Sequence, residues 1–196
     1  MSDLQCAVRL YVARHAEAEF ETVEMYDVGG GLTAAGRAQA VALAERLFGE
    51  RIAAVWTSPM SRAVQTAEIV AARLGVGVTV REGLREFSVG NHAGQLPEPD
   101  PLVGTFTSWI AGELDERVSG GESGREVVSR VEGVLQEVAD LHRGEAVLVV
   151  SHGGAICLSV ATLTGMAPPS DFRLANTGVV HVDGDGDGWV LAEPWG

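Results

Sequence analysis

The chain has 196 residues, of which 46% are hydrophobic and 21% are charged, and its formal net charge is −13. This length and composition are typical of a globular protein, and we expect residues 1–196 to fold as a single domain. All 14 cationic side chains are arginines, set against 27 acidic ones, so neither nucleic acid nor an anionic membrane is expected as a partner.

The sequence carries no signal for export or for membrane insertion. The first five residues do not begin a basic segment followed by an apolar core, and no apolar run approaches the ~20 residues of a membrane helix. We therefore expect a cytoplasmic protein. Cys6 and Cys157 stand far apart and have no metal-ligand spacing, which predicts two reduced thiols.

The first part of the chain alternates strand and helix patterns. An apolar run predicts a strand over residues 7–12, and a polar, glycine-rich loop follows over residues 17–31. Thr33 is a suitable N-cap for the next helix, because apolar residues recur after it at helical spacing. A second strand over residues 52–57 and a helix over residues 60–74 come next.

The alternation continues through the middle of the chain. A β-branched run predicts a strand over residues 76–80, residues 84–94 are expected to form a loop, and a helix is predicted near residues 105–114. Ser123 and Glu126 have the spacing of a capping box, which predicts the start of a long helix.

The last part predicts a strand over residues 146–150, a helix over residues 154–163 and a closing hairpin of residues 179–182 and 189–191. This order of elements predicts an α/β fold. We expect a three-layer α/β/α sandwich with a mostly parallel central sheet.

Two of the predicted strands are followed by histidines. Arg14 and His15 follow the strand over residues 7–12, and His152 follows the strand over residues 146–150. Ligand sites in open α/β sheets form at the carboxyl ends of the strands, so we expect both histidines in one crevice. Two imidazoles beside a fixed cation indicate covalent chemistry on an anion.

An acidic repeat at residues 183–188 matches only the first half of a calcium-binding loop. Pro194 occupies the twelfth position, where such a loop needs a bidentate glutamate. The sequence also has no His-x-His or His-Glu-x-x-His pair to hold zinc. We expect a plain hairpin turn, with no metal and no cofactor.

Four sequence blocks, taken in order, resemble the histidine phosphatase superfamily, the phosphoglycerate mutase-like proteins. The blocks are Arg14-His15, Thr57-Ser58-Pro59-Met60-Ser61-Arg62-Ala63, Leu84-Arg85-Glu86-Phe87 and Ser151-His152-Gly153. The resemblance extends from about Arg9 to Val182. It implies a phosphoglycerate mutase-like fold and a phosphoric monoester hydrolase.

The resemblance also implies roles for five residues. His15 would be the nucleophile that carries the phosphoryl group. Arg14, Arg62 and His152 would hold the phosphoryl oxygens and stabilise the transition state. Glu86 would protonate the leaving oxygen, which requires a raised pKa.

Three more residues are expected to bind the substrate. Gly153 begins a predicted helix and would offer a backbone N–H. His92 stands where the family loop often has an aromatic residue, and Glu17 begins one of the two loops in which specificity is expected.

One departure from the family pattern bears on the activity. Ala16 stands where glycine is most common, as in short protein-phosphohistidine phosphatases, but those proteins generally lack a glutamate acid. Glu86 therefore favours a metal-independent phosphatase of small phosphate monoesters that works through a phosphohistidine.

Several alternatives stay open at this point. They are a phosphoglycerate mutase-type phosphoryl transferase, a protein-phosphohistidine phosphatase and a non-catalytic module that binds phosphorylated ligands. Glu82 or His92 could replace Glu86 as the acid. The expected partner is a small phosphorylated substrate, and a homo-oligomer is possible.

Overall fold

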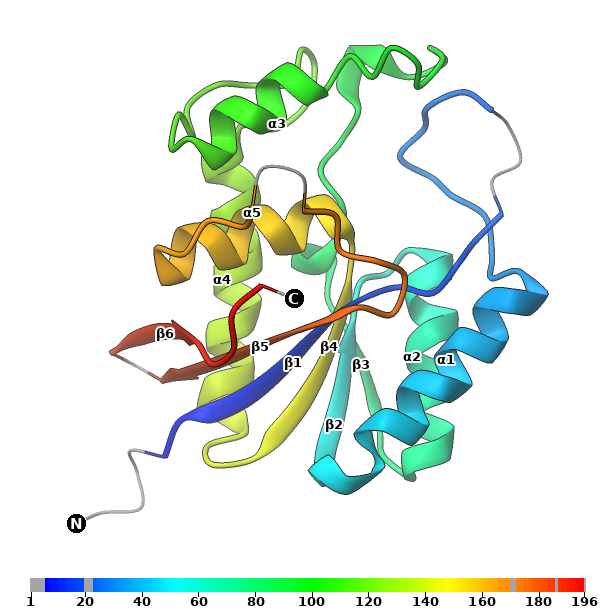
Figure 1. The fold of residues 1–196 in the computed structure, drawn as a ribbon, viewed down its shortest axis with the longest axis vertical. Helices are drawn as coiled ribbons and strands as arrows, with labels where there is room; N and C mark the ends of the chain where they lie inside the picture. The colour runs from blue at the N-terminus through cyan, green and yellow to red at the C-terminus, as the bar shows by residue number, and fades with distance from the viewer. Residues whose placement is uncertain (1–5, 20–22, 170–171, 186, 196) are drawn as a thin grey trace.

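A six-stranded sheet with helices on both faces forms the molecule (Figure 1). The computed structural model describes residues 6–19, 23–169, 172–185 and 187–195. The strands lie in the order β3-β2-β4-β1-β5-β6. Their bounds are Val8–Arg14 (β1), Ile52–Thr57 (β2), Val78–Val80 (β3), Ala146–Ser151 (β4), Val179–Asp185 (β5) and Gly188–Leu191 (β6). β1 to β4 pair in parallel and β5 and β6 pair antiparallel, so the expected mostly parallel sheet is confirmed.

Five α-helices cover the sheet. Their bounds are Ala34–Leu47 (α1), Ser61–Leu74 (α2), Val103–Ile110 (α3), Gly124–Leu141 (α4) and Gly153–Thr164 (α5). α1 and α2 pack on one face, α4 and α5 pack on the other, and α3 lies beyond α5 near the carboxyl ends of the parallel strands (Figure 1). This is the expected three-layer sandwich.

Alternation along the strands divides the core into two layers. In β1, Leu10 and Val12 face the layer that contains α4 and α5, whereas Tyr11 and Ala13 face α1 and α2. All six residues of β4 are buried, because this strand has neighbours in the sheet and helices on both faces. The carboxyl ends of β1 and β4, which precede the two histidines, are therefore held by neighbouring strands and by the packed layers on both faces of the sheet.

The two predicted N-terminal helix caps are confirmed. The Thr33 hydroxyl accepts a hydrogen bond from the Gly36 N–H at the start of α1. Ser123 and Glu126 form both bonds of the capping box at the start of α4.

Several boundaries differ from the predictions, and three elements show the physical reasons. β1 continues to Arg14, beyond the apolar run, because Arg14 still pairs with Ser151 of β4. β3 begins at Val78 rather than at residue 76, since the Val76 N–H bonds back to a carbonyl of α2. α3 spans Val103–Ile110 instead of residues 105–114, and Gly112, with φ +99°, turns the chain away soon after its end.

The closing hairpin is longer than predicted. β5 runs to Asp185, so the first half of the acidic repeat is strand and not turn. Gly184 pairs with Trp189 across the hairpin, and a Cβ on this glycine would lie 2.1 Å from the indole ring. The missing side chain makes room for Trp189 and permits the strand to continue.

Two other expectations concern the chain as a whole. Cys6 and Cys157 are both free thiols, as predicted. Within the described ranges, none of the helices combines the length and the apolar character that a membrane crossing requires.

Candidate active site

The paired ends of β1 and β4 bring the two histidines together. The His15 N–H donates to the Ser151 carbonyl, and His152 is the next residue after Ser151. The centroids of the two imidazole rings are 5.1 Å apart. The prediction that both histidines come together at the carboxyl ends of the strands is confirmed.

The His15 ring is held from both of its nitrogens. Nδ1 lies 2.8 Å from the Ala16 carbonyl oxygen, and the Nε–H of Arg62 points to Nε2 at 3.1 Å. These partners assign the ring proton to Nδ1 and the lone pair to Nε2. The pKa of His15 is lowered to about 4. Burial is the main cause, the charges of Arg62 and Arg14 add to it, and the hydrogen bond to the Ala16 carbonyl opposes it. The imidazole is therefore neutral at physiological pH.

The two arginines reach the site from different elements. Arg62 lies in the first turn of α2, and its side chain is buried. Arg14 ends β1 and donates from Nη1 to the Leu174 carbonyl at 2.7 Å. A Cβ on Gly153 would lie 3.5 Å from the Arg14 side chain, so this glycine packs closely beside it. Two guanidinium groups beside an imidazole have the charge and the donors that binding of a phosphoryl group requires.

His152 is buried and is oriented by Ser58, a residue that the sequence analysis did not single out. The Ser58 hydroxyl lies 2.8 Å from His152 Nε2. Burial lowers the pKa of His152 well below its usual value, with further contributions from Arg62 and His15. The Ser58 hydroxyl also accepts from the Met60 N–H at 3.3 Å. Ser58 and His152 are 94 positions apart, so no local pattern pointed to their contact.

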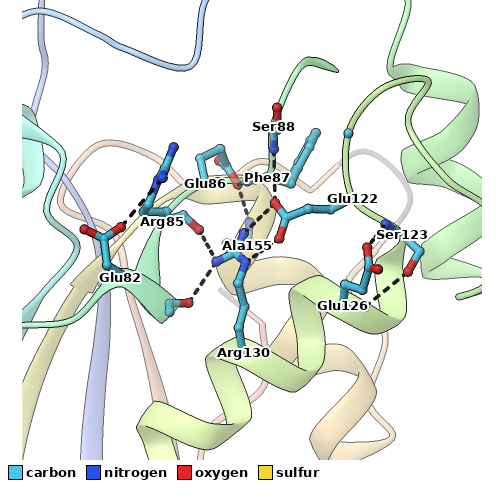
Figure 2. Close-up of polar contacts among 12 residues, drawn as sticks. Glu82, Arg85, Glu86, Phe87, Ser88, Glu122, Ser123, Glu126, Arg130 and Ala155 are labelled. Carbon is cyan, nitrogen blue, oxygen red and sulfur yellow. Dashed lines mark hydrogen bonds and ion pairs between the residues drawn. The ribbon is translucent and has the colours of Figure 1, made fainter. Parts of the chain in front are cut away.

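Glu86 is anchored at the N-terminus of α5. Its carboxylate accepts from the Gly154 N–H at 3.0 Å and from the Ala155 N–H at 2.7 Å (Figure 2). Burial raises the pKa of Glu86, and these N–H groups together with that of Phe87 oppose the rise. A Cβ on Gly154 would lie 2.4 Å from the Phe87 ring, so only glycine permits this approach.

The alternative acids are placed less favourably. Glu82 is 77% exposed and pairs with Arg85 at 3.6 Å (Figure 2). His92 lies in the 3-10 turn η4 (Gly90–His92), where Nδ1 is 3.2 Å from Gln95 Oε1. Glu86, by contrast, is buried, which raises its pKa, and its carboxylate interacts electrostatically with Arg62.

Glu17 is tied to the start of α1. Its carboxylate accepts from the Thr33 hydroxyl at 2.7 Å, and its backbone N–H donates to Gln39. The contacts of Glu17 and His92 are with their own loops and helix ends, and those of Gly153 are with Arg14. A role in substrate binding stays a prediction for all three.

The exit of β1 is clamped by the segment before β5. Asn176 donates from Nδ2 to the His15 carbonyl at 3.0 Å, and the Thr177 N–H donates to the Arg14 carbonyl at 3.1 Å. Thr177 has φ +55°, a conformation that is uncommon for a threonine. From the other side, the Thr66 hydroxyl accepts from the Ala16 N–H. Asn176 and Thr177 belong to a segment, Asn176-Thr177-Gly178, that also resembles the superfamily, but the sequence analysis gave neither them nor Thr66 a role at the site.

The loop that precedes α1 is joined to the loop after Glu86. Asp27 accepts from the Ser88 hydroxyl and from the Val89 N–H, each at 2.7 Å. The Met25 N–H also donates to the Gln95 carbonyl. We call the residues that these bonds join, namely Met25, Asp27, Ser88, Val89 and Gln95, the rim, because Ser88 lies two residues after Glu86.

Comparison with known proteins settles the family. The model of the histidine phosphatase superfamily (branch 1) matches residues 10–194. The chain belongs to the histidine phosphatase superfamily. It is an enzyme of the histidine phosphatase type, as the four sequence blocks predicted, and the site described above is where the family's blocks meet.

Individual members of the superfamily match nearly the whole chain. A putative phosphoserine phosphatase 2 of Hydrogenobacter thermophilus is 29% identical over 187 residues, which are 90% of this chain and 91% of the relative. A probable phosphoglycerate mutase of Salmonella choleraesuis is 30% identical over 196 residues, 96% of this chain and 90% of the relative. A mycobacterial glucosyl-3-phosphoglycerate phosphatase has a similar structure, with a TM-score of 0.80 and 25% identity. The match covers 96% of this chain and 99% of the phosphatase.

Proposed function

We propose that this protein hydrolyses small phosphate monoesters through a phosphohistidine on His15. The observation that carries the proposal is the state of that imidazole. It is neutral, its pKa being about 4, and the Nδ1 bond to the Ala16 carbonyl leaves the lone pair on Nε2. An oriented neutral imidazole with two guanidinium groups nearby is well suited to attack a phosphoryl group as a nucleophile.

In the first step, Nε2 of His15 attacks phosphorus, and the bond from phosphorus to the ester oxygen breaks. The Arg62 N–H that points to Nε2 in the free protein turns to a phosphoryl oxygen, which frees the lone pair. Arg14 and His152 stabilise the charge on the phosphoryl oxygens. Glu86, which is protonated at this stage, gives its proton to the leaving oxygen.

In the second step, water attacks the phosphorus of the phosphohistidine. The Glu86 carboxylate takes a proton from this water, and the electron pair of the broken P–N bond returns to His15. The products are inorganic phosphate and the starting enzyme, with Glu86 protonated again. Burial of Glu86 supports both of its roles, because it raises the pKa towards the working range.

We also propose that no metal ion takes part. Arg14 and Arg62 supply the positive charge that divalent ions supply in many phosphoryl-transfer enzymes. Across the described ranges, no three His, Cys, Asp or Glu side chains are grouped as metal ligands. Turnover is expected to survive excess EDTA, and its loss on chelation with recovery on adding a divalent ion would contradict this part of the proposal.

Trapping the intermediate tests the main proposal. The enzyme is mixed with a radiolabelled phosphate monoester and quenched in alkali during turnover, because phosphohistidine is stable in alkali and labile in acid. Label is expected on the peptide that contains His15. Turnover without any acid-labile phosphate on the protein would refute the covalent route.

The substrate class is supported by the names of the relatives. The phosphoserine phosphatase and the glucosyl-3-phosphoglycerate phosphatase are named for small phosphate monoesters. A second candidate is a mutase, because a relative with 30% identity is named as a probable phosphoglycerate mutase. Isomerisation of phosphoglycerate without release of phosphate would favour the mutase.

A further inference from the structure

Arg130, on α4, binds the backbone on the N-terminal side of Glu86. Its Nη1 donates to the Gly83 carbonyl at 2.8 Å and to the Arg85 carbonyl at 2.6 Å (Figure 2). Two of its other donors bind Glu122, with Nε at 2.7 Å from Oε1 and Nη2 at 3.1 Å from Oε2. The guanidinium therefore links two carbonyls of one segment to a carboxylate.

Glu122 continues the link to the C-terminal side of Glu86. Its Oε2 accepts from the Ser88 N–H at 3.3 Å. We call residues 83–88 the acid segment. Arg130 and Glu122 thus hold the acid segment at three backbone positions, namely Gly83, Arg85 and Ser88, which lie on both sides of Glu86 (Figure 2).

This ion pair is more buried than the other ion pairs of α4. The Arg130 and Glu122 side chains are 21% and 27% exposed. The values are 39% and 39% for Arg81–Glu137, 51% and 51% for Arg117–Glu126, and 64% and 82% for Arg125–Asp115. A partly buried guanidinium that is bonded in two directions holds its partners more rigidly than an exposed pair does.

Close packing gives the acid segment little freedom to settle elsewhere. A Cβ on Gly83 would lie 2.6 Å from the Arg130 carbonyl, so this turn rests directly on the backbone of α4. On the other side, the Phe87 ring packs against Trp109, with ring centroids 5.2 Å apart. The carboxylate of Glu86 itself meets the N-terminus of α5.

We propose that Arg130 and Glu122 are positioning residues for the proton transfer, since they fix the backbone that presents the Glu86 carboxyl group to the leaving oxygen. This inference rests on the proposed function of Glu86 as the proton donor. A proton donor must come within about 2.6–3.2 Å of its acceptor. A displacement of about 1 Å can slow a reaction by roughly 10², so loss of the ion pair affects the chemistry even if the fold survives.

The test compares two substrates on the same enzyme preparation. An alkyl phosphate needs a protonated leaving group, whereas a nitrophenyl phosphate does not. Arg130→Gln is expected to slow single-turnover cleavage of the alkyl ester by roughly 10–10² and that of the aryl ester by less than about threefold. The ratio of the two rates is independent of the folded fraction, so partial unfolding does not imitate the effect.

Three further variants complete the test. Glu122→Gln removes the other half of the ion pair and should change the ratio in the same direction, and Arg130→Lys should restore it in part. Glu137→Gln is the matched control, because Glu137 pairs with Arg81 two turns along α4 and makes the same kind of ion pair. It should leave the ratio unchanged.

A double variant shows whether Arg130 acts through Glu86. Once Glu86→Gln has removed the acid, adding Arg130→Gln should change the ratio no further. Equal slowing of both esters, multiplied effects in the double variant, or the same change in Glu137→Gln would overturn the positioning role. If Glu86→Gln itself slows both esters equally, the proposed function of Glu86 fails instead, and the two failures are thereby distinguished.

Discussion

The reacting centre and its rim are built in different ways. At the centre, the two arginines and the two histidines lie at the ends of regular elements. Arg14 ends β1 and His15 follows it, Arg62 opens α2, and His152 directly precedes α5. At the rim, Asp27 joins two irregular segments through bonds to Ser88 and Val89. The centre is fixed by sheet pairing and helix packing, whereas the rim depends on a few bonds from side chains to loops.

This difference separates two kinds of function. A centre fixed by β1 and β4 keeps its geometry whatever ester is bound, which suits a chemical step common to all substrates. A rim held by individual hydrogen bonds can be altered without disturbing the sheet, which suits discrimination among substrates. Substitutions at the centre should therefore affect every ester alike, and those at the rim should affect esters differently.

The largest effect is expected from His15→Ala. Turnover of every phosphate ester and covalent labelling should both be abolished, because Nε2 of His15 is the atom proposed to carry the phosphoryl group. Rapid-quench labelling measures both. His152→Ala is the comparison, and should keep some labelling while slowing it by roughly 10²–10³. Label trapped on the His15→Ala protein would refute the assignment.

Glu86 lies in the loop between η3 (Glu82–Leu84) and η4, outside the strand and helix ends of the centre, and the effect of Glu86→Gln should depend on the leaving group. Cleavage of alkyl phosphates should slow by roughly 10²–10⁴, the usual scale for a lost general acid. A nitrophenyl phosphate should be barely affected, since its leaving group departs without a proton. Single-turnover rates on the two esters measure this, and equal slowing would show that Glu86 is structural.

Ser58→Ala should have a moderate effect on all esters. It removes the hydrogen bond to His152 Nε2, which is worth about 1–2 kcal/mol and corresponds to a roughly tenfold lower kcat. Ser61→Ala is a suitable control, since the Ser61 hydroxyl accepts only an exposed bond from Gln65. An unchanged kcat in Ser58→Ala would mean that His152 does not depend on this bond.

The smallest effect is expected from Asp27→Ala. Releasing Ser88 and Val89 should raise KM for bulky esters by roughly three- to tenfold, on the scale of one or two hydrogen bonds, and should leave kcat for a nitrophenyl phosphate unchanged. In the control Asp100→Ala, the carboxylate that is removed serves only the Leu102 N–H in its own turn. A fall in kcat for both esters would show that the rim also supports the centre.

The centre was largely predictable from the sequence, and the reason is physical. Strand and helix periodicity locate the ends of β1 and β4, and topology then brings His15 and His152 together. Arg14 was predicted to follow its strand, yet it forms the last residue of β1 because pairing with Ser151 outlasts the apolar run.

The supporting residues could not be predicted, because their partners are remote in sequence. Ser58 and His152 are separated by 94 positions, Asn176 and His15 by 161, and Asp27 and Ser88 by 61. Local patterns describe neighbours within a turn or a strand and contain no information on such pairs. The roles in substrate binding expected for Glu17, His92 and Gly153 stay predictions, because the contacts of these residues are with other parts of the protein.

The position of β1 in the sheet has a consequence for the newly made chain. β1 is synthesised first, but it lies between β4 and β5, which begin at Ala146 and Val179. The groups that hold the carbonyls of Arg14 and His15, at Asn176 and Thr177, also emerge from the ribosome late. His15, the proposed nucleophile, is thus synthesised before the strands and side chains that orient it. The site described here is therefore assembled only after β4, Asn176, Thr177 and β5 have been synthesised.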